Sequence, residues 1–349
     1  MEKKKVLVGM SGGVDSSVSA LLLKNNGYEV VGTSMTLYSE CEKLQENEDA
    51  KKICNQLDIP YYEYDFRNDF RKYVINDFIK TYSECKTPNP CIECNKYMKF
   101  GKMYDIAKEL GCEYIATGHY AKTEYSEKYK RWVLKKSKAG KKDQSYVLWS
   151  IPKELIEHII FPLSDFQNKD EIRKIARDIN LDVANKPDSE DICFVPDGNY
   201  KRFLENNSSI RPKIGNITTT KGEVLGKHTG MYNYTIGQRK GLGVSYKSPL
   251  FVIGFDKEKN EVIVGEKEEL FKKEILVSDI NLLLVDKIVG EMEVSVKTRY
   301  SSNEAKAKIT QDGNNIKVVF DEPQRAITPG QSAVFYIDDI VVGGGKIVK

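Results

Sequence analysis

Residues 11–17 place two glycines, an acid and three hydroxyl side chains directly after an apolar run. The apolar run, residues 6–8, favours a β-strand, and residues 18–24 favour a helix, so we expect the loop to end at a helix N-terminus. Such an end directs free backbone N–H groups and the positive pole of the helix at one point, which suits a phosphate. Gly12 and Gly13 permit the positive φ and the close approach that a phosphate needs.

Asp15 is the unusual member of this loop, because a carboxylate beside phosphates needs a cation such as Mg²⁺. Ser16 and Ser17 can cap the helix or donate a hydrogen bond to an anion. The loop is not a Walker A sequence, since no Gly-Lys-Ser/Thr follows it, and it lacks the third glycine of the dinucleotide fingerprint. An ordinary glycine-rich turn between a strand and a helix is the alternative interpretation.

A second stretch that could do chemistry contains Cys91 and Cys94, preceded by Pro88 and Pro90. The prolines favour an extended approach, and we expect a helix that begins near Cys94. A cysteine at a helix N-terminus has a stabilised thiolate and is a nucleophile at neutral pH. Three interpretations compete. The pair could be half of a zinc site, although the chain lacks a second cysteine pair, or a thioredoxin-like redox pair, although that needs another fold. The third is a sulfur-handling pair formed by Cys94 and the distant Cys193.

The elements that must position these residues alternate between strand and helix in the first part of the chain. We expect strands at residues 28–37, 60–64 and 112–118, and helices at residues 47–57, 66–82, 96–110, 152–159 and 169–179. This alternation predicts an α/β fold with a doubly wound parallel sheet. Ligands bind beyond the carboxyl ends of such strands, which places Met35 and Gly118 near the opening loop. A core role for Met35 and an ordinary hydrogen-bonded role for His119 are the alternatives.

Residues 128–142 form the one dense basic stretch, with eight lysines and arginines, no acid, and two aromatic residues, Tyr129 and Trp132. Basic and aromatic side chains together offer phosphate contacts and base stacking, whereas a solvated surface is the simpler alternative. The following residues 142–146 can hydrogen-bond to a nucleic-acid backbone or base edge.

From about residue 203 the residue pattern changes to one typical of short strands and turns. The last segment alternates polar and apolar residues, as in a small all-β barrel. We therefore expect a catalytic α/β domain at residues 1–203, a central β-rich domain at 204–271 and a C-terminal β-barrel at 272–349.

The composition contains 54 Lys and Arg against 51 Asp and Glu, so the formal net charge of +3 gives no global argument for nucleic acid. No apolar run has membrane-spanning length, and the first strand follows the first few residues directly, which leaves no room for a signal peptide. Seven cysteines, an odd number in a long chain, argue against a secreted disulfide framework. We therefore expect a cytoplasmic protein.

Several motifs carry a resemblance to a known family. SGGVDSS resembles the PP-loop of the N-type ATP pyrophosphatases, which adenylate their substrates. The motifs SGGVDSS, TPNPCIECNKYMKFG, ATGHYA, KDQSYVLW, DSEDICFV, YTIGQRKGLGV, TRY and PGQSAVFY follow one another across almost the whole chain. As a set they are similar to the bacterial tRNA-specific 2-thiouridylases.

The resemblance implies that ATP adenylates the C2 oxygen of wobble uridine 34 in tRNAs of the Lys, Glu and Gln type, with release of pyrophosphate. Cys193 would carry a persulfide from a sulfur-relay protein or cysteine desulfurase, and Cys94 would be the nucleophile, leaving a Cys94–Cys193 disulfide. Mg²⁺ would accompany ATP near Asp15. The implied ATP-binding residues are Gly9, Met10, Ser11, Gly12, Gly13, Val14, Asp15, Ser16, Met35 and Gly118. Those implied around the flipped base are Asn89, Pro90 and Cys91, and those implied to contact tRNA are His119, Lys142, Asp143, Gln144, Arg299, Tyr300 and Gln331.

The chain departs from the family at Cys91, where many members have an aspartate with an acid–base role. A thiol with a pKa near 8.5 is a different base, so either that help is dispensable or Cys91 has another function. One hypothesis is that Cys91, Cys94 and Cys193 hold a [4Fe–4S] cluster with one open iron.

Two other functions remain open from the sequence. Another PP-loop adenylating ligase or tRNA-modifying enzyme, such as an amidotransferase-type synthetase, would not need Cys94 or Cys193. A nucleotide-binding tRNA chaperone would release no pyrophosphate.

Overall fold

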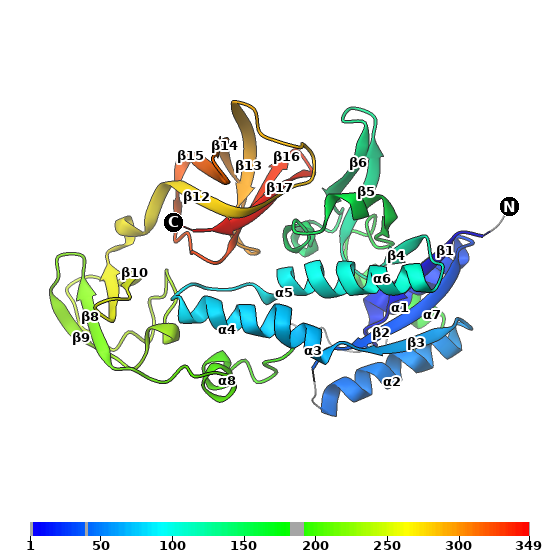
Figure 1. The fold of residues 1–349 in the computed structure, drawn as a ribbon, viewed down its shortest axis with the longest axis horizontal. Helices are drawn as coiled ribbons and strands as arrows, with labels where there is room; N and C mark the ends of the chain where they lie inside the picture. Colours follow the sequence, from blue (N-terminus) through cyan, green and yellow to red (C-terminus); the bar gives the residue numbers. More distant parts are fainter. Residues whose placement is uncertain (1–2, 39–40, 182–191, 349) are drawn as a thin grey trace.

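A computed structural model describes residues 3–38, 41–181 and 192–348, and the side chains of residues 41–46 are outside the description. Figure 1 shows an α/β part formed by the N-terminal half of the chain, a small β-sheet formed by its middle, and a C-terminal barrel. Two helical rods run across the molecule between them. Residues 188–191, the first half of the motif DSEDICFV, lie outside the described residues.

The α/β part is built on a parallel sheet with the strand order β3-β2-β1-β4-β7. Val6 and Val8 of β1 pack on one face and Leu7 on the other, because successive strand residues point to opposite sides. Both faces are buried, which confirms the doubly wound parallel sheet. The strands are β1 (Lys5–Gly9), β2 (Glu29–Thr36), β3 (Tyr61–Asp65), β4 (Tyr114–Ala116) and β7 (Ile159–Ile160).

Helices cover both faces of this sheet. Helices α1 (Val14–Asn25), α2 (Cys41–Gln56) and α7 (Lys169–Asp178) share the core of the first face, and α6 (Met103–Glu109) packs on the second. The expected helix at residues 152–159 is instead a short 3₁₀ segment, η5 (Lys153–His158).

The first helical rod consists of α3 (Arg67–Phe70), η1 (Arg71–Ile75) and α4 (Asn76–Ser83), close to the expected helix at residues 66–82. The second consists of α5 (Pro90–Glu93), η2 (Cys94–Lys102) and α6, and it contains a π-helical stretch from Cys94. The expectation that this helix begins near Cys94 is wrong, because it begins at Pro90. Proline is favoured at the first helical position, where its fixed φ is already helical and no N–H is needed.

The middle of the chain forms a small sheet with the order β10-β11-β8-β9 and its own core around Ile217, Val252 and Val262. Its strands are β8 (Gly215–Thr219), β9 (Val224–His228), β10 (Phe251–Asp256) and β11 (Glu261–Gly265), and α8 (Tyr200–Asn207) leads into it.

The C-terminal strands close into a barrel, because β12 pairs with β15 on one side and with β17 on the other. Its strands are β12 (Phe271–Leu282), β13 (Glu291–Lys297), β14 (Ala305–Asp312), β15 (Asn315–Arg325), β16 (Ser332–Ile337) and β17 (Ile340–Ile347). This confirms the predicted barrel.

A hairpin from the α/β part stands beside the barrel in Figure 1. Its strands are β5 (Ala121–Ser126) and β6 (Arg131–Lys136), and β6 contains Arg131, Lys135 and Lys136 of the basic stretch. Lys135 pairs with Ile340 of β17. Val133 of this hairpin is buried in the barrel core, so the hairpin fixes the barrel to the α/β part. None of the helices in the described part of the chain is long and apolar enough to cross a membrane.

Candidate functional site

The opening loop connects β1 to α1 at the carboxyl end of the sheet. Gly12 has φ +66°, a conformation that glycine adopts without strain, whereas Gly13 has φ −107° and does not need that freedom. Gly13 is the N-cap of α1, so no side chain within the described residues caps the first-turn amides. These amides are available to an anion, as phosphate binding at a helix N-terminus requires.

The serines of the loop hold its shape. Ser16 Oγ and Ser17 Oγ donate to the carbonyl of Gly13 at 3.1 and 2.8 Å, and Ser11 Oγ lies 3.2 Å from Ser16 Oγ. The sequence predicted that Ser16 and Ser17 cap the helix or donate to an anion. In this structure both hydroxyls donate to the carbonyl of Gly13 instead, which stiffens the turn.

Asp15 already has two partners. Lys169 Nζ of α7 lies 2.9 Å from Asp15 Oδ2, and the Tyr120 hydroxyl donates to Asp15 Oδ1 at 2.9 Å. Sequence reasoning missed both residues, since no local pattern links positions so far apart. The carboxylate is therefore balanced by a lysine, and a bound Mg²⁺ would compete with that lysine for the same oxygens.

Gly118 and Met35 end the two strands that flank β1. An ideal Cβ on Gly118 would lie 2.8 Å from Ser16 N, so the backbone that follows β4 lies directly against the N-terminus of α1. Met35 is half-buried at the end of β2 and packs against both the second sheet face and the helical rods. The strand order reverses between β1 and β4, so the loop and Gly118 face each other at the topological switch point, where ligands bind in such sheets.

The predicted thiols lie on helix α5 and its continuation. Asn89 is the N-cap, Pro90 opens the helix, and Cys91 follows in the first turn. Cys94 lies in the second turn, at the start of η2, and is 8 % exposed. The helix N-terminal argument made for Cys94 thus applies to Cys91, which is exposed.

Two observations place Cys193 in the region of Cys91 and Cys94. Phe194 and Val195 belong to the same buried cluster as Cys94, and Phe194 packs edge-on against Phe70. Burial raises the pKa of the Cys91 thiol. The charge of Lys99 lowers this pKa, and the charge of Cys193 raises it. Cys91 is thus accessible yet closely surrounded by protein, and it feels the charge of Cys193.

Cys91, Cys94 and Cys193 are the candidate ligands of an iron–sulfur cluster. Among the described residues, which include Cys91, Cys94 and Cys193, no group of three His, Cys, Asp or Glu side chains has a metal-binding arrangement. The thiols are neighbours, but in this conformation they do not fit a cluster.

His119 and Lys99 connect the loop to the thiols. His119 follows Gly118, is buried against Phe100 and Phe161, and its Nδ1 lies 2.7 Å from Thr117 Oγ1. Burial, reinforced by the charge of Lys99, holds the pKa of His119 well below its ordinary value. His119 is therefore a buried neutral imidazole here, not a surface contact, and Lys99 is a cation near both His119 and Cys91 that sequence reasoning missed.

The segment 142–144 is ordered by its own hydrogen bonds. Asp143 Oδ1 accepts from Ser137 N at 2.8 Å, and Asp143 Oδ2 accepts from Ser145 Oγ at 2.6 Å. Gln144 Oε1 accepts from Tyr120 N at 3.0 Å, whereas Lys142 is exposed. Of the three predicted tRNA contacts, only Lys142 presents its side chain outward.

The predicted barrel residues lie at domain junctions. Arg299 donates to the carbonyls of Ile236 and Ala326, which joins the barrel to the middle sheet. Tyr300 is 39 % exposed, and its pKa is raised by burial and then by the charges of Asp143 and Cys91, so it lies near the thiols.

Gln331 braces the segment in front of the thiols. Its Nε2 donates to the carbonyls of Thr87 and Pro88 at 3.0 and 3.1 Å. The barrel thereby holds the residues that lead into Asn89, Pro90 and Cys91.

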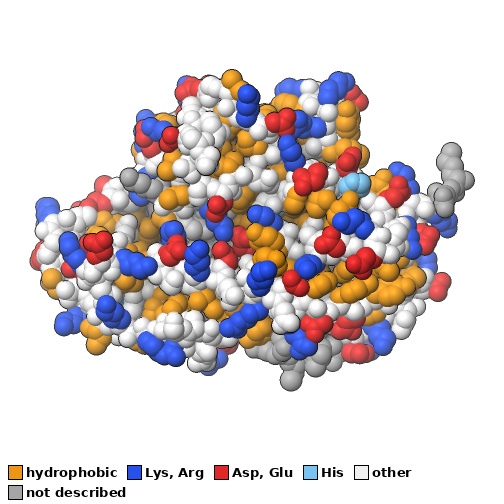
Figure 2. All heavy atoms as spheres, viewed as in Figure 1, with side chains coloured by type: hydrophobic (Ala, Val, Ile, Leu, Met, Phe, Trp, Pro, Cys, Tyr) orange, Lys and Arg blue, Asp and Glu red, His pale blue; other side chains and the backbone are white. Residues whose placement is uncertain are grey.

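The basic stretch at residues 128–142 is largely neutralised. Its cations pair with acids outside the stretch at Lys130–Glu127, Arg131–Asp286, Lys135–Glu124, Lys136–Glu304 and Lys138–Asp165. On the face seen in Figure 2, blue and red side chains are interspersed. The stretch is therefore not the free phosphate-binding surface that its composition suggested, although Trp132 remains 39 % exposed.

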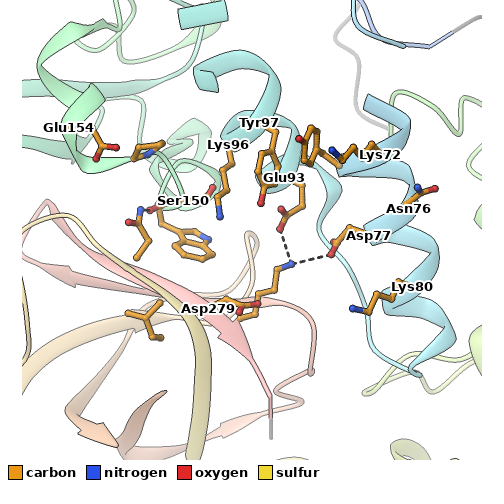
Figure 3. A pocket seen from close by; sticks show the side chains of 16 residues that line it. Lys72, Asn76, Asp77, Lys80, Glu93, Lys96, Tyr97, Ser150, Glu154 and Asp279 are labelled. Atoms are coloured by element: carbon orange, nitrogen blue, oxygen red, sulfur yellow. Dashed lines mark hydrogen bonds and ion pairs between the residues drawn. The ribbon is translucent and has the colours of Figure 1, made fainter. Parts of the chain in front are cut away.

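A cavity of about 740 Å³ lies between the helical rods and the barrel (Figure 3). Lys346 Nζ of β17 lies 2.9 Å from Glu93 Oε1 and 3.3 Å from Asp77 Oδ1, the dashed lines in Figure 3. Glu93 is two positions after Cys91 and so points in another direction. The barrel therefore contacts the thiol-bearing helix through Lys346 as well as through Gln331.

Comparisons with known proteins cover the chain from end to end. Residues 4–197 match the family described as tRNA methyl transferase HUP domain, residues 201–266 the tRNA methyl transferase PRC-barrel domain, and residues 272–347 the aminomethyltransferase beta-barrel domain. A protein of Clostridioides difficile (strain 630) named tRNA-specific 2-thiouridylase MnmA is 48 % identical over 356 residues, covering 99 % of this chain and 98 % of its own. A protein of the same name from Acetivibrio thermocellus is 47 % identical over 360 residues, covering 99 % of this chain and 100 % of its own.

This chain belongs to the tRNA-specific 2-thiouridylase family. A solved structure of the U34-tRNA thiolase NcsA from Methanococcus maripaludis with its [4Fe-4S] cluster is more distant, with 21 % identity, a TM-score of 0.39, and coverage of 60 % of this chain and 69 % of that one. That similarity identifies no ligand of this chain. Membership of the 2-thiouridylase family agrees with a nucleotide loop and neighbouring thiols on one scaffold.

Proposed function

We propose that this chain is an ATP-dependent tRNA 2-thiouridylase that replaces the C2 oxygen of wobble uridine 34 by sulfur in tRNAs of the Lys, Glu and Gln type. The observation that carries the proposal is that the charges of Lys99 and Cys193 act on Cys91, and that Phe194 shares the buried cluster of Cys94, in a domain that also contains the phosphate-type loop. Family membership supports it over the full length. Since tRNA and ATP are cytosolic, we place the enzyme in the cytoplasm.

In the first step, ATP lies along the loop with its phosphates on the first-turn amides of α1. The C2 oxygen attacks the α-phosphate, pyrophosphate leaves, and AMP becomes the leaving group on C2. Mg²⁺ would be held by the phosphates and Asp15, with Lys169 released from Asp15. The residues that we propose to surround ATP are Gly9, Met10, Ser11, Gly12, Gly13, Val14, Asp15, Ser16, Met35 and Gly118.

In the second step, Cys193 carries a persulfide received from a sulfur-relay protein or cysteine desulfurase. The Cys94 thiolate attacks the Cys193 sulfur and releases hydrosulfide, which displaces AMP from C2. One 2-thiouridine, one AMP and one Cys94–Cys193 disulfide result, and the disulfide must be reduced before the next cycle. This step uses the thiols alone.

The flipped uridine would lie against Asn89, Pro90 and Cys91, with Tyr300 near it from the barrel. Lys142, on the exposed edge of its segment, is the proposed cation for the tRNA backbone. His119, Asp143, Gln144, Arg299 and Gln331 would act on tRNA from positions that are internally bonded in this structure. We assign catalysis to residues 1–203 and contacts along tRNA to 204–271 and 272–349.

One experiment separates this function from its rivals. The protein is incubated with ATP, Mg²⁺, sulfide and unmodified tRNA, and 2-thiouridine and pyrophosphate are measured. The proposal expects both products, a tRNA chaperone yields neither, and another adenylating ligase yields pyrophosphate without 2-thiouridine.

The cysteine variants test the assignment of roles. With a persulfide donor, Cys94→Ser and Cys193→Ser are each expected to lose the product, while Cys85→Ser, six positions before Cys91, retains it. Added sulfide should partly restore Cys193→Ser, because sulfide replaces the sulfur that Cys193 carries. Full activity of Cys94→Ser with the persulfide donor would contradict the mechanism.

A further inference from the structure

We propose that Cys91 is a third catalytic thiol, which takes over the disulfide from Cys193 after each thiolation and so frees Cys193 for the next persulfide. This inference rests on the proposed function. It assigns a role to the residue at which this chain departs from the aspartate of many family members.

The positions of the two helix cysteines support an exchange between them. Cys91 and Cys94 are three residues apart on a continuous helix, with Cys94 still at φ −61° and ψ −45°. Helix geometry places Cα atoms at this spacing about 5 Å apart, within the roughly 4.4–6.8 Å range of disulfides. Residues at this spacing also share a face of the helix.

The two thiols differ in access to solvent. Cys91 is exposed in the first turn, whereas Cys94 is 8 % exposed and packed in the cluster that contains Phe194. A disulfide between Cys94 and Cys193 would thus have its accessible sulfur at Cys193, the residue that must receive the next persulfide. A disulfide between Cys91 and Cys94 keeps an accessible sulfur at Cys91.

The third thiol is within reach of the pair. Cys193 is exposed, and its charge raises the pKa of Cys91. The adjoining Phe194 belongs to the same buried cluster as Cys94. Lys99 on the same helix favours the thiolate of Cys91. Cys91 and Cys94 therefore share one helix, and the segment of Cys193 packs in the cluster of Cys94.

The exchange is balanced without an added oxidant. The Cys91 thiolate attacks Cys94 Sγ of the Cys94–Cys193 disulfide, the Cys91–Cys94 bond forms, and the Cys94–Cys193 bond breaks. The electron pair leaves on Cys193 as thiolate, and one proton lost by Cys91 is available to Cys193. A dithiol reductant then attacks the exposed Cys91 sulfur and returns both helix cysteines to thiols.

The test is a single turnover followed by disulfide mapping. The full chain, with its iron content measured as below stoichiometric, is loaded with one persulfide and mixed with ATP, Mg²⁺ and unmodified tRNA without reductant. Acid and N-ethylmaleimide stop the reaction, and unreduced peptides are identified by mass spectrometry. The wild type should contain the Cys91–Cys94 disulfide and an alkylated Cys193.

The variant Cys91→Ser provides a second readout. For each 2-thiouridine that it forms in the first turnover, it should retain one Cys94–Cys193 disulfide. Relative to its own first turnover, its later turnovers with a dithiol reductant should be several-fold slower than those of the wild type. Cys85→Ser is the matched control and should behave as the wild type in all three measurements.

The wild-type map decides the proposal even if Cys91→Ser folds poorly. A wild type that ends with Cys94 joined to Cys193 and with Cys91 alkylated would overturn it, as would equal multiple-turnover rates for folded Cys91→Ser and wild type. A wild type that makes no 2-thiouridine in the first turnover contradicts the proposed function itself.

Discussion

Gly118 lies directly against the backbone of Ser16, so that a Cβ on Gly118 would be 2.8 Å from the Ser16 nitrogen. This contact joins the end of β4 to the N-terminus of α1 and closes one side of the proposed ATP site. The nearest atoms, Ser16 N and Asp15 C, belong to the backbone of α1 and leave no room for even one methyl group.

Gly118→Ala is expected to displace the loop and to weaken ATP binding, with pyrophosphate release falling at a fixed ATP concentration. The control is Gly254→Ala, where a Cβ meets no atom within 4 Å. Equilibrium binding of ATP and the rate of pyrophosphate release check the prediction, and unchanged ATP affinity in Gly118→Ala would contradict it.

Lys346 is expected to hold the barrel to the thiol-bearing helix. Lys346→Met leaves Asp77 and the 10 % exposed Glu93 side chain without their cation. Removing one partner of a mostly buried ion pair costs about 3 kcal/mol, so the free energy of unfolding should fall by that order. Urea denaturation measures the loss, and the double variant Lys346→Met/Glu93→Gln should recover part of it.

The same pair predicts a pH dependence. Burial acts to lower the pKa of Lys346, but Glu93 and Asp77 outweigh it, and the net shift is upward from 10.5. The stabilisation is then fully present below pH 10.5 and is lost as the pH rises through the higher folded-state pKa. Wild type should lose more stability than Lys346→Met in that alkaline range, and parallel losses would contradict the assignment.

Gln331 is expected to position the segment before Cys91 even without tRNA. Gln331→Leu removes both hydrogen bonds to Thr87 and Pro88, at a cost of about 1–2 kcal/mol, and should change the rate at which iodoacetamide alkylates Cys91. Gln324→Leu, which loses only a bond to Glu322 on the barrel, is the control. A Gln331 that acts through tRNA alone would leave alkylation of the tRNA-free protein unchanged.

His119 is expected to make the protein less stable in mild acid. Its folded-state pKa lies well below 6.5 because of burial and then Lys99, so near that pH a proton binds the unfolded chain in preference to the folded one. The free energy of unfolding should therefore fall as the pH drops from about 7.5 to about 5.5. His119→Gln should show a smaller fall in urea titrations, with the partly exposed His158→Gln as control.

The sequence by itself determined the parallel sheet, the glycine loop at a helix N-terminus, the thiol segments and the change to β-structure in the second half. These features depend on short-range patterns: apolar periodicity, the freedom of glycine, and the exclusion of proline from helix interiors. The helix start was misplaced because proline was taken as a barrier, although it is also favoured at the first helical position.

Only the tertiary structure decided which charges and hydroxyls are already occupied. Asp15 meets Lys169 across 154 positions, and Gln331 meets Thr87 across 244. Arg131 and Lys136 of the basic stretch pair with Asp286 and Glu304 of the barrel. Such pairs arise from the packing of distant segments, which no local pattern encodes. Packing likewise buried Cys94 and left Cys91 exposed in the first turn, and this reverses the sequence's assignment of the helix N-terminal thiol.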